Sequence, residues 1–451
     1  MASAAEQLAA NMNFASFQKA TELHKRIWFT IIALVVYRLG TYVPIPGIDA
    51  AAFERLFSGN AEGILGMFNT FSGGAVQRMA IFSLNVMPYI SASIIVQLMG
   101  TVYPPWEKLK KEGGEAGRKT LNQYTRYLAV VLAVVQSASI AMGLQAQPGV
   151  VAGGIGPAFF VVSTVVALTG GTLFLMWLGE QITSRGVGNG VSLIIFAGIV
   201  AHLPMTLGQL FVQAQTSGNY TPLFLILIGA VAAILAIVFM ERSQRRLLVH
   251  YPKRQQGNRM IGGESSFMPL KINTSGVIPP IFASSLLLLP TTAMQFMSTT
   301  NLPEHLSWLP GVVGALQHGH PAFLIFYALL IIFFSFFYTS VVFNPEETAE
   351  NLRKYGGFLP GIRPGKRTAE YLDYVLTRLT VIGAAYITAV CVAPELVMMS
   401  IKSNQFALGG TSILIVVTVT MDTVAQIQSH LLAHQYEGLI KKSKLRGGRN
   451  R

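Results

Sequence analysis

The sequence carries little charge and a single cysteine. Only 12% of its 451 residues are Asp, Glu, Lys or Arg, about half of the roughly 25% found in soluble globular domains. A soluble domain is therefore excluded, and so are a disordered chain and a coiled coil, because both are rich in charged residues. The one cysteine, Cys391, can form neither an intrachain disulfide nor a cysteine metal cluster.

Sequence signatures of enzymes and metal sites are missing as well. The chain contains no HExxH, Walker A or GxSxG motif. The glycine-rich run at 186–190 follows a predicted apolar helix and not a strand, which makes it a poor phosphate loop. His430 and His434 share a helix face but have no third ligand. We therefore expect this chain to be no enzyme and to hold no metal and no cofactor.

Long apolar stretches dominate the rest of the sequence, in which 52% of the residues are hydrophobic. A helix needs about 20 apolar residues to cross a bilayer. Windows of this length predict ten transmembrane helices, at 27–45, 79–101, 123–144, 157–179, 187–205, 221–240, 275–297, 321–343, 374–394 and 408–430. The segment before them, 1–26, leads into a run without a small-residue cleavage site, so no cleaved signal peptide is expected. The predicted fold is an all-α polytopic membrane protein.

Basic residues indicate which ends of these helices face the cytoplasm. The chain has 33 Lys and Arg against 20 Asp and Glu, a net charge of +13. With a cytoplasmic N-terminus, 29 of the 33 basic residues lie on the cytoplasmic side, as the positive-inside rule requires. The exceptions are Arg38, Arg55, Arg78 and Lys402. We expect both the N-terminal segment and the basic tail, 431–451, to be cytoplasmic.

Ten helices divide into two halves of five, at 27–205 and 206–430. Because five is an odd number, a second half that repeats the first must be inverted across the membrane. Inverted repeats are common in membrane proteins that conduct a substrate between their halves. The helix count alone supports this repeat, since the halves show no strong sequence similarity.

Residues 57–78 are too interrupted by glycine and polar groups to cross a bilayer, yet they are apolar enough to be buried. Irregular backbone at membrane depth is tolerated only inside protein or in a wet cavity. A short half-helix here could fold back into such a cavity as a movable stopper. The alternative is an ordinary external loop.

One face of the second predicted helix changes from apolar to polar along its length. Successive turns of this face present Val86, Ile90, Ser93 and Gln97. Val191 and Ile195 make a similar pair, four residues apart, in the fifth helix. An apolar constriction that opens into a polar funnel is the chemistry of a hydrophobic gate. The alternative is ordinary packing against lipid or protein.

Two predicted cytoplasmic loops, 241–271 and 344–373, are longer and more basic than topology requires. Their cationic side chains would suit an acidic protein partner, the phosphates of ribosomal RNA or anionic lipid. The second loop contains Gly-Ile-Arg-Pro-Gly at 361–365, which is typical of a shaped turn.

Two other functional classes remain open at this point. A secondary transporter of small solutes also uses inverted five-helix repeats, but it needs polar ligands near the midplane, and the candidate face here is apolar. A membrane-embedded enzyme needs a cluster of acid, base or metal ligands within the helices. The ionisable residues in the predicted spans, Arg38, Asp422 and Arg378, are scattered.

Eight strings, in unbroken order between residues 87 and 365, resemble the SecY family, the channel subunits of the bacterial Sec protein translocase. They are Met-Pro-Tyr-Ile-Ser-Ala-Ser-Ile-Ile at 87–95, Gln-Tyr-Thr-Arg-Tyr at 123–127, Trp-Leu-Gly-Glu-Gln-Ile-Thr at 177–183, Gly-Asn-Gly at 188–190, Tyr-Pro-Lys-Arg-Gln-Gln-Gly at 251–257, Gly-Val-Ile-Pro at 276–279, Phe-Asn-Pro-Glu-Glu-Thr-Ala at 343–349 and Gly-Ile-Arg-Pro-Gly at 361–365. The resemblance runs from about residue 15 to 440.

The resemblance implies a ten-helix clamshell with inverted halves, a pore ring, a plug and a lateral gate. The implied pore ring is Val86, Ile90, Val191, Ile195, Ile281 and Ile415. The implied plug is Glu62, Gly63, Ile64, Leu65, Gly66, Met67, Phe68, Asn69, Thr70, Phe71, Ser72, Gly73, Gly74 and Ala75. The implied lateral gate lies at Ser91, Ser285 and Leu289. Two valines stand in the ring where some relatives have isoleucine, which would make it slightly wider.

The resemblance also implies partners and a location. Unfolded preproteins would cross the bacterial inner membrane, and their signal sequences and membrane helices would leave sideways into lipid. A SecA-type ATPase or the ribosome would drive transport, and SecE- and SecG-type subunits would accompany the channel. The implied contacts for motor or ribosome are Arg246, Arg254, Arg259 and Arg363. Asn258 interrupts the basic pair expected at the tip of the first loop.

Overall fold

The computed structural model describes residues 21–60, 69–111, 113–146, 149–153, 156–218, 220–251, 254–256, 259–261, 265–296, 321–401 and 409–447. Within these ranges, ten helices coincide with the ten predicted spans. They are α3 (Thr21–Gly40), α6 (Met87–Val102), α8 (Gly114–Ala146), α9 (Pro157–Arg185), α10 (Gly190–Ser217), α11 (Thr221–Arg242), α12 (Ile278–Phe296), α14 (Pro321–Val342), α16 (Lys366–Ile401) and α17 (Gly410–Gly447). Seven of them are long and apolar enough to cross a membrane, and α6 and α12 are shorter apolar helices.

The second span begins later than the sequence suggested. Its prediction started at residue 79, but α6 begins only at Met87. The backbone before it turns repeatedly, and Met79 and Asn85 have positive φ angles of 45° and 49°, which a helix cannot accommodate. Pro88 then occupies the first turn of α6, where its missing N–H is not needed. The predicted start of this helix was therefore wrong by about two turns.

Several other helices extend past their predicted ends. α17 continues to Gly447, so most of the predicted basic tail is helical. α16 begins at Lys366, inside the second basic loop. The hydrophobic windows located membrane crossings correctly, but they could not find polar turns that continue the same helix beyond the apolar stretch.

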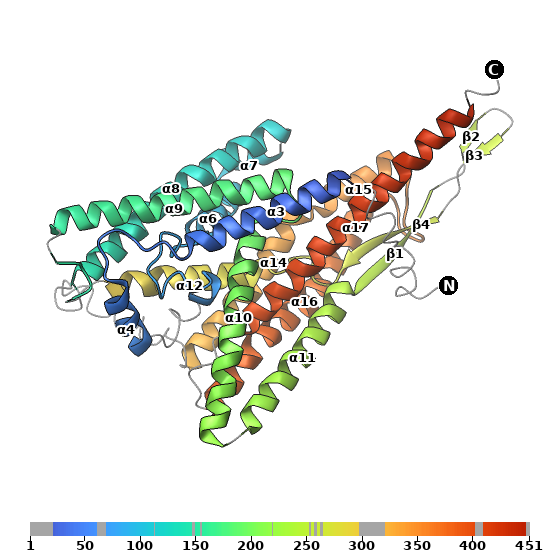
Figure 1. Ribbon diagram of the computed structural model, residues 1–451. Helices are drawn as coiled ribbons and strands as arrows, with labels where there is room; N and C mark the ends of the chain where they lie inside the picture. The colour runs from blue at the N-terminus through green and yellow to red at the C-terminus, as the bar shows by residue number, and fades with distance from the viewer. Residues whose placement is uncertain are drawn as a thin grey trace.

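The helices form two groups joined at the centre of the molecule. α3, α6, α8 and α9 make up one group, and α11, α14, α16 and α17 make up the other (Figure 1). α10 contacts α3 and α9 on one side and α11 and α17 on the other. α12 contacts α14 within the second group, and it also contacts α6 and α8 of the first. The largest buried hydrophobic cluster lies where the groups meet, and it takes residues from both.

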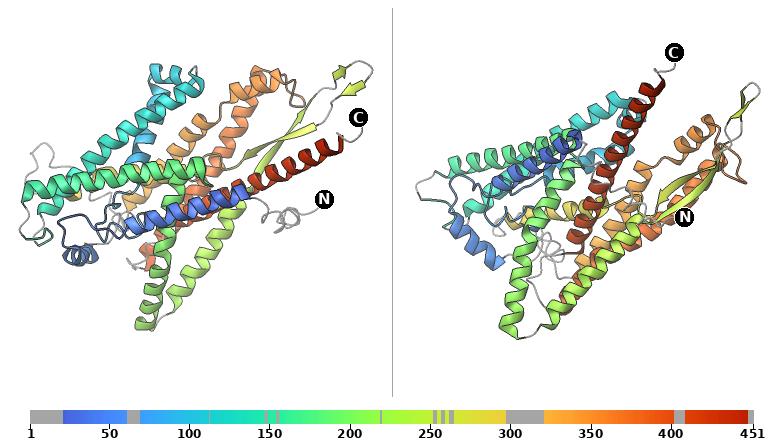
Figure 2. Two further views of the ribbon diagram at one scale, coloured as in Figure 1. Left: turned by 45° about the horizontal axis from the view of Figure 1, so that its top comes forward. Right: turned by 45° about the vertical axis from the view of Figure 1, so that its right-hand side comes forward.

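The two basic loops fold into one unit at the end of the molecule where α17 finishes (Figure 2). Strand β1 (Gln244–His250) pairs antiparallel with β4 (Ser265–Lys271), and the short β2 (Arg254–Gln256) pairs with β3 (Arg259–Ile261). The second loop contributes α15 (Pro345–Lys354), which begins with the Asn344 side chain accepting from two main-chain N–H groups.

The two loops share a hydrophobic cluster that is separate from the central one. It combines strands β1 and β4 with α15, α16 and the turn between them, through Leu247, Val249, Leu270, Ala349, Leu359, Ala369, Leu372, Val375, Leu376 and Leu379. His250 and Phe358 also exchange two main-chain hydrogen bonds of 2.9 and 3.0 Å. We call residues 244–271 and 343–365 the loop unit. At the opposite ends of the helices lies α4 (Ala50–Asn60), whose first turn is capped by Asp49 (Figure 1).

Candidate functional site

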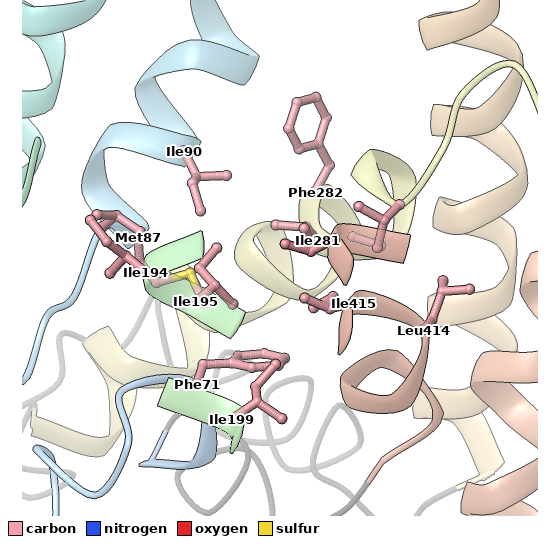
Figure 3. Close-up of a cluster of buried hydrophobic side chains, with 14 of the residues drawn as sticks. Phe71, Met87, Ile90, Ile194, Ile195, Ile199, Ile281, Phe282, Leu414 and Ile415 are labelled. Carbon is pink, nitrogen blue, oxygen red and sulfur yellow. The ribbon is translucent and has the colours of Figure 1, made fainter. Parts of the chain in front are cut away.

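Four isoleucines from four helices converge at the centre of the molecule. Ile90 of α6 and Ile195 of α10 lie on one side, and Ile281 of α12 and Ile415 of α17 lie on the other (Figure 3). All four belong to the largest buried cluster, and none is more than 8% exposed. These side chains offer no hydrogen-bonding group.

The two valines of the predicted ring lie at the same cluster. Val86, immediately before α6, is fully buried in it, and Val191 is a partly buried neighbour packed against it. Val86 is held in place by its main-chain N–H, which donates to the Asn85 side chain over 2.9 Å. The structure thus brings all six predicted ring residues to one apolar cluster, from both helix groups.

A buried segment, residues 69–86, packs beneath this cluster. Phe71 points toward Ile195 and Ile199 (Figure 3), and it is 1% exposed. Every residue from Asn69 to Ala75 is buried. The external-loop interpretation is therefore wrong for this part of the chain. The rest of the predicted plug, Glu62–Phe68, lies outside the described residues.

Hydrogen bonds fasten the buried segment by its main chain. The Tyr37 hydroxyl donates to the Ser72 carbonyl over 3.2 Å, and the Asn85 side-chain amide donates to the Phe71 carbonyl over 2.8 Å. Gly198 of α10 lets the segment approach closely, because a Cβ there would lie 2.3 Å from the Phe71 oxygen. The chain turns at Gly73 and Gly74, whose φ angles of 67° and 84° favour glycine.

Two arginines meet at this turn. Arg38 and Arg78 both donate to the Gly73 carbonyl, over 2.5 and 3.0 Å. Their guanidinium carbons lie 4.9 and 4.1 Å from the centre of the Tyr42 ring, within cation–π range. Partial burial lowers the pKa of Arg78 from its ordinary value, although an arginine remains a cation.

Sequence reasoning missed most of these fastening residues. Tyr37, Asn85 and Gly198 carry no sequence signal, since ordinary helix packing also uses such residues. Arg38 and Arg78 did stand out as basic residues outside the predicted cytoplasmic segments. That exception, and for Arg38 its place inside a predicted span, were the available signs that their charges have a local purpose.

The predicted lateral gate residues lie where α12 meets α6. The Ser285 hydroxyl lies 3.5 Å from the sulfur of Met87 and can donate to it. Ser91 and Ser285 are both buried. The side chain of Leu289, further along α12, lies outside the described residues. Among the described residues, α6 and α12 thus meet at this seam through apolar packing and the weak contact between Ser285 and Met87.

The predicted docking residues lie on the loop unit. Arg246 of β1 and Arg363, in the turn before α16, are exposed. The Arg363 carbonyl accepts from the Thr368 hydroxyl over 2.9 Å, which shapes the turn. Arg254 and Arg259 lie on the short strands β2 and β3, and their side chains are outside the described residues. Among the residues that the structure describes, no cluster of three or more His, Cys, Asp or Glu could hold a metal ion.

Comparison with known proteins shows the family of this chain. The SecY family model matches residues 80–424. The chain belongs to the SecY family. Within that family, the protein translocase subunit SecY of Rickettsia typhi is 52% identical over 438 residues, which cover 96% of this chain and 99% of that protein.

Solved structures share the SecY fold. One is a SecY protein whose plug domain is described as stabilising the closed state of the translocation channel; it has a TM-score of 0.63 at 19% identity and covers 90% of this chain and 92% of its own. Another is Sec61 in the canine ribosome–channel complex from the endoplasmic reticulum, with a TM-score of 0.58 at 19% identity and the same coverage. The SecY-family chain is a multi-pass membrane protein and a protein-translocation channel subunit, so a transporter of small solutes is not favoured.

Proposed function

We propose that unfolded preproteins cross the bacterial inner membrane through the cluster formed by Ile90, Ile195, Ile281 and Ile415, with Val86 and Val191 completing the ring. The observation that carries this proposal is that six apolar side chains from both helix groups meet in one buried cluster. Both termini lie in the cytoplasm, as the charge distribution requires. The halves 27–205 and 206–430 move apart to open the path.

An apolar ring suits a channel that must pass every sequence. Its side chains make no hydrogen bonds to a passing polypeptide, so no sequence is held strongly. In the closed state the same side chains leave no polar surface for water, and a hydrophobic constriction excludes ions by dewetting. Selectivity therefore comes from opening the channel and not from binding along the path.

Residues 62–75 act as the plug of the closed channel. Support comes from the described part, in which Phe71 packs against the ring cluster and Gly73 is hydrogen-bonded by two arginines. The contacts of the described part are apolar packing and hydrogen bonds from side chains to its main chain, so the segment can leave without unfolding a transmembrane helix. Glycines near both of its ends, at 63 and 66 and at 73 and 74, supply the freedom to move.

The seam between α6 and α12, at Ser91, Ser285 and Leu289, serves as the lateral gate. Little free energy is needed to break weak contacts such as that between Ser285 and Met87. A signal sequence or a membrane helix can then pass sideways, because each apolar CH₂ that moves from water into lipid gains about 0.8 kcal/mol. The SecY-family channel needs no cofactor for this step.

Transport is driven from outside the chain, by a SecA-type ATPase or by the ribosome. The exposed arginines of the loop unit, with Arg254 and Arg259 on its tip strands, provide cationic contacts for either partner. A ribosome-bound relative with the same fold supports the second possibility. SecE- and SecG-type subunits complete the complex within the lipid bilayer.

Site-specific crosslinking in inverted membrane vesicles tests the proposal. A photo-crosslinker is placed at Ile281, at Leu289 or, as a control, at Phe239, which is exposed on α11. A secretory protein is then stalled during transport. We expect its mature part to react at Ile281, its signal sequence at Leu289 and neither at Phe239. If the stalled chain reacts at neither Ile281 nor Leu289 while export proceeds, the path does not run through this ring.

A further inference from the structure

One buried hydrogen bond closes the base of the β1–β4 hairpin. Glu241 is the penultimate residue of α11, and Asn273 follows β4 by two residues. The Asn273 side-chain nitrogen donates to the Glu241 carboxylate over 2.6 Å, across 32 residues of chain. Next to it, the Ile272 N–H donates to the Ser243 carbonyl over 3.2 Å. These two hydrogen bonds join the end of α11 to the chain after β4, at the base of the hairpin.

The same asparagine also builds the turn that starts α12. Its amide nitrogen donates to the Gly276 carbonyl over 3.2 Å, and its oxygen accepts from the Gly276 N–H and the Ser275 hydroxyl, each over 3.1 Å. All four hydrogen-bonding positions of the amide are therefore filled. Gly276 has a φ of 63°, so the chain reverses sharply there before α12 begins at Ile278.

Glu241 and Asn273 are both buried, so the loss of their hydrogen bond is strongly destabilising. Asn273 is 3% exposed and Glu241 is 9% exposed. A buried carboxylate that loses its donor keeps the full cost of leaving water. Lys271 and Asp422 also interact electrostatically with Glu241, with opposite signs. The asparagine is the partner that holds this carboxylate in one position.

The junction rests directly on α16. A Cβ at Gly383 would lie 2.9 Å from the Ile272 oxygen, so a glycine is needed for the strand end to come this close. α16 begins at Lys366, immediately after the Arg363 turn. Both loops of the loop unit are therefore connected to the contact between Ile272 and Gly383. The first loop reaches it through β4 and the second through α16.

From this point α12 leads to the ring and to the gate. Ile281 and Ser285 lie about one and two turns into the helix. Since a helix of this length is stiff, a displacement at its first residue is carried to both positions. Among the described residues 272–277, no other side chain forms a hydrogen bond to a transmembrane helix.

We propose that Glu241 and Asn273 form the joint through which a partner bound to the loop unit displaces α12 and opens the lateral gate. Both are positioning residues, and neither touches the transported chain. The inference rests on the proposed function, because it presumes that the loop unit binds the driving partner and that α12 lines the gate. It assigns the transmission of that movement to one hydrogen bond.

Gate movement can be measured through a cysteine pair. Met87→Cys and Ser285→Cys are combined with Cys391→Ser, so that the pair contains the sole thiols of the chain. The rate of crosslinking by a short dithiol-reactive reagent is compared in proteoliposomes with and without the ATP-loaded SecA-type motor. Motor affinity is measured in parallel. In the parent the motor should slow crosslinking because it separates α6 from α12.

Glu241→Ala is the decisive variant, because it removes the tie and leaves the Asn273–Gly276 turn intact. We expect motor affinity to stay within about twofold and the motor-induced slowing to fall about tenfold, the factor for one lost hydrogen bond to a charged group. Glu241→Gln retains an oxygen acceptor and should behave like the parent. Thr274→Ala is the matched control, since it loses a neighbouring exposed hydrogen bond to the Lys271 carbonyl.

Each outcome of the crosslinking experiment either supports or overturns the proposed joint. If Glu241→Ala binds the motor and its gate responds like the parent, the joint is not the route and the inference is overturned. Asn273→Ala, which removes the tie from the other side, must give the same loss, and it decides the question if Glu241→Ala does not fold. A parent whose crosslinking never responds to a bound motor contradicts the proposed function itself, which is a different outcome.

Discussion

Arg38 and Arg78 donate hydrogen bonds to one main-chain oxygen, that of Gly73, over 2.5 and 3.0 Å. Two cations converge on a single peptide group although like charges repel each other. The ring of Tyr42 lies within reach of both guanidinium groups and its face attracts them. The proposed plug is therefore held at its glycine turn by charge-assisted bonds, whereas its contacts with the ring are apolar and undirected.

Arg78→Ala should loosen the closed channel. It removes the donor groups that reach the carbonyls of Gly73 and Thr41, and one hydrogen bond from a charged group is worth about 1.5–3 kcal/mol. We expect about a tenfold higher ion conductance of the resting channel in planar bilayers. Arg378→Ala is the control, because Arg378 stacks on Tyr374 away from the buried segment. Equal conductance in the two variants would contradict the role of Arg78.

Gly198→Ala should displace the buried segment by overpacking. Its new methyl group would lie 2.3 Å from the Phe71 oxygen, and overpacking of this kind costs about 1–3 kcal/mol. We expect a lower thermal midpoint in detergent and a leakier resting channel. Gly208→Ala, in the same helix, meets nothing within 4 Å and should cause neither effect. A midpoint of Gly198→Ala that matches the control would show that the segment is not packed against α10.

Ile195→Asn should admit water and ions at the ring. The amide places hydrogen-bonding groups among side chains that have none, so a hydrophobic constriction can no longer dewet. We expect a resting conductance well above that of Ile195→Leu, which keeps the volume and the apolar character. Measurement of ion efflux from proteoliposomes compares the two. A tight Ile195→Asn channel would place the seal elsewhere.

Arg363→Glu should block motor-driven export and leave the insertion and folding of the chain intact. The side chain is exposed, and surface substitutions change stability by about 0.5 kcal/mol or less. Reversing its charge removes attraction to an acidic partner surface and adds repulsion. Arg185→Glu, exposed at the end of α9, is the charge-matched control. Normal ATP-dependent export in vesicles that carry Arg363→Glu would contradict the role of Arg363 in motor binding.

The sequence alone predicted the membrane crossings, because a long apolar stretch has no other stable environment than lipid or protein interior. It also singled out Val86 and Ile90 as one apolar helix face, because they are separated by about one helical turn, with ordinary packing left as the alternative. The resemblance to relatives supplied Ile281 and Ile415, which no local pattern distinguishes from other buried isoleucines. All of these positions now lie at one cluster.

The start of α6 could not be read from the same patterns. Residues 79–86 are as apolar as a helix interior, yet they form turns. The Asn85 side chain bonds to the Phe71 carbonyl and to the Val86 N–H, and the Ile81 N–H bonds to the Val43 carbonyl. Hydropathy measures the environment of a residue and not its main-chain partner. The external-loop interpretation of residues 69–75 failed for the same reason.

Apolar length therefore determined where the spans lie, and the sidedness of charge predicts their direction, since both depend on the transfer of each segment by itself. The tertiary structure decided which groups far apart along the chain meet: Gly73 with two arginines, Phe71 with Gly198, and Glu241 with Asn273. Such contacts depend on how the helices pack together, and that packing is a property of the whole molecule and not of any one segment.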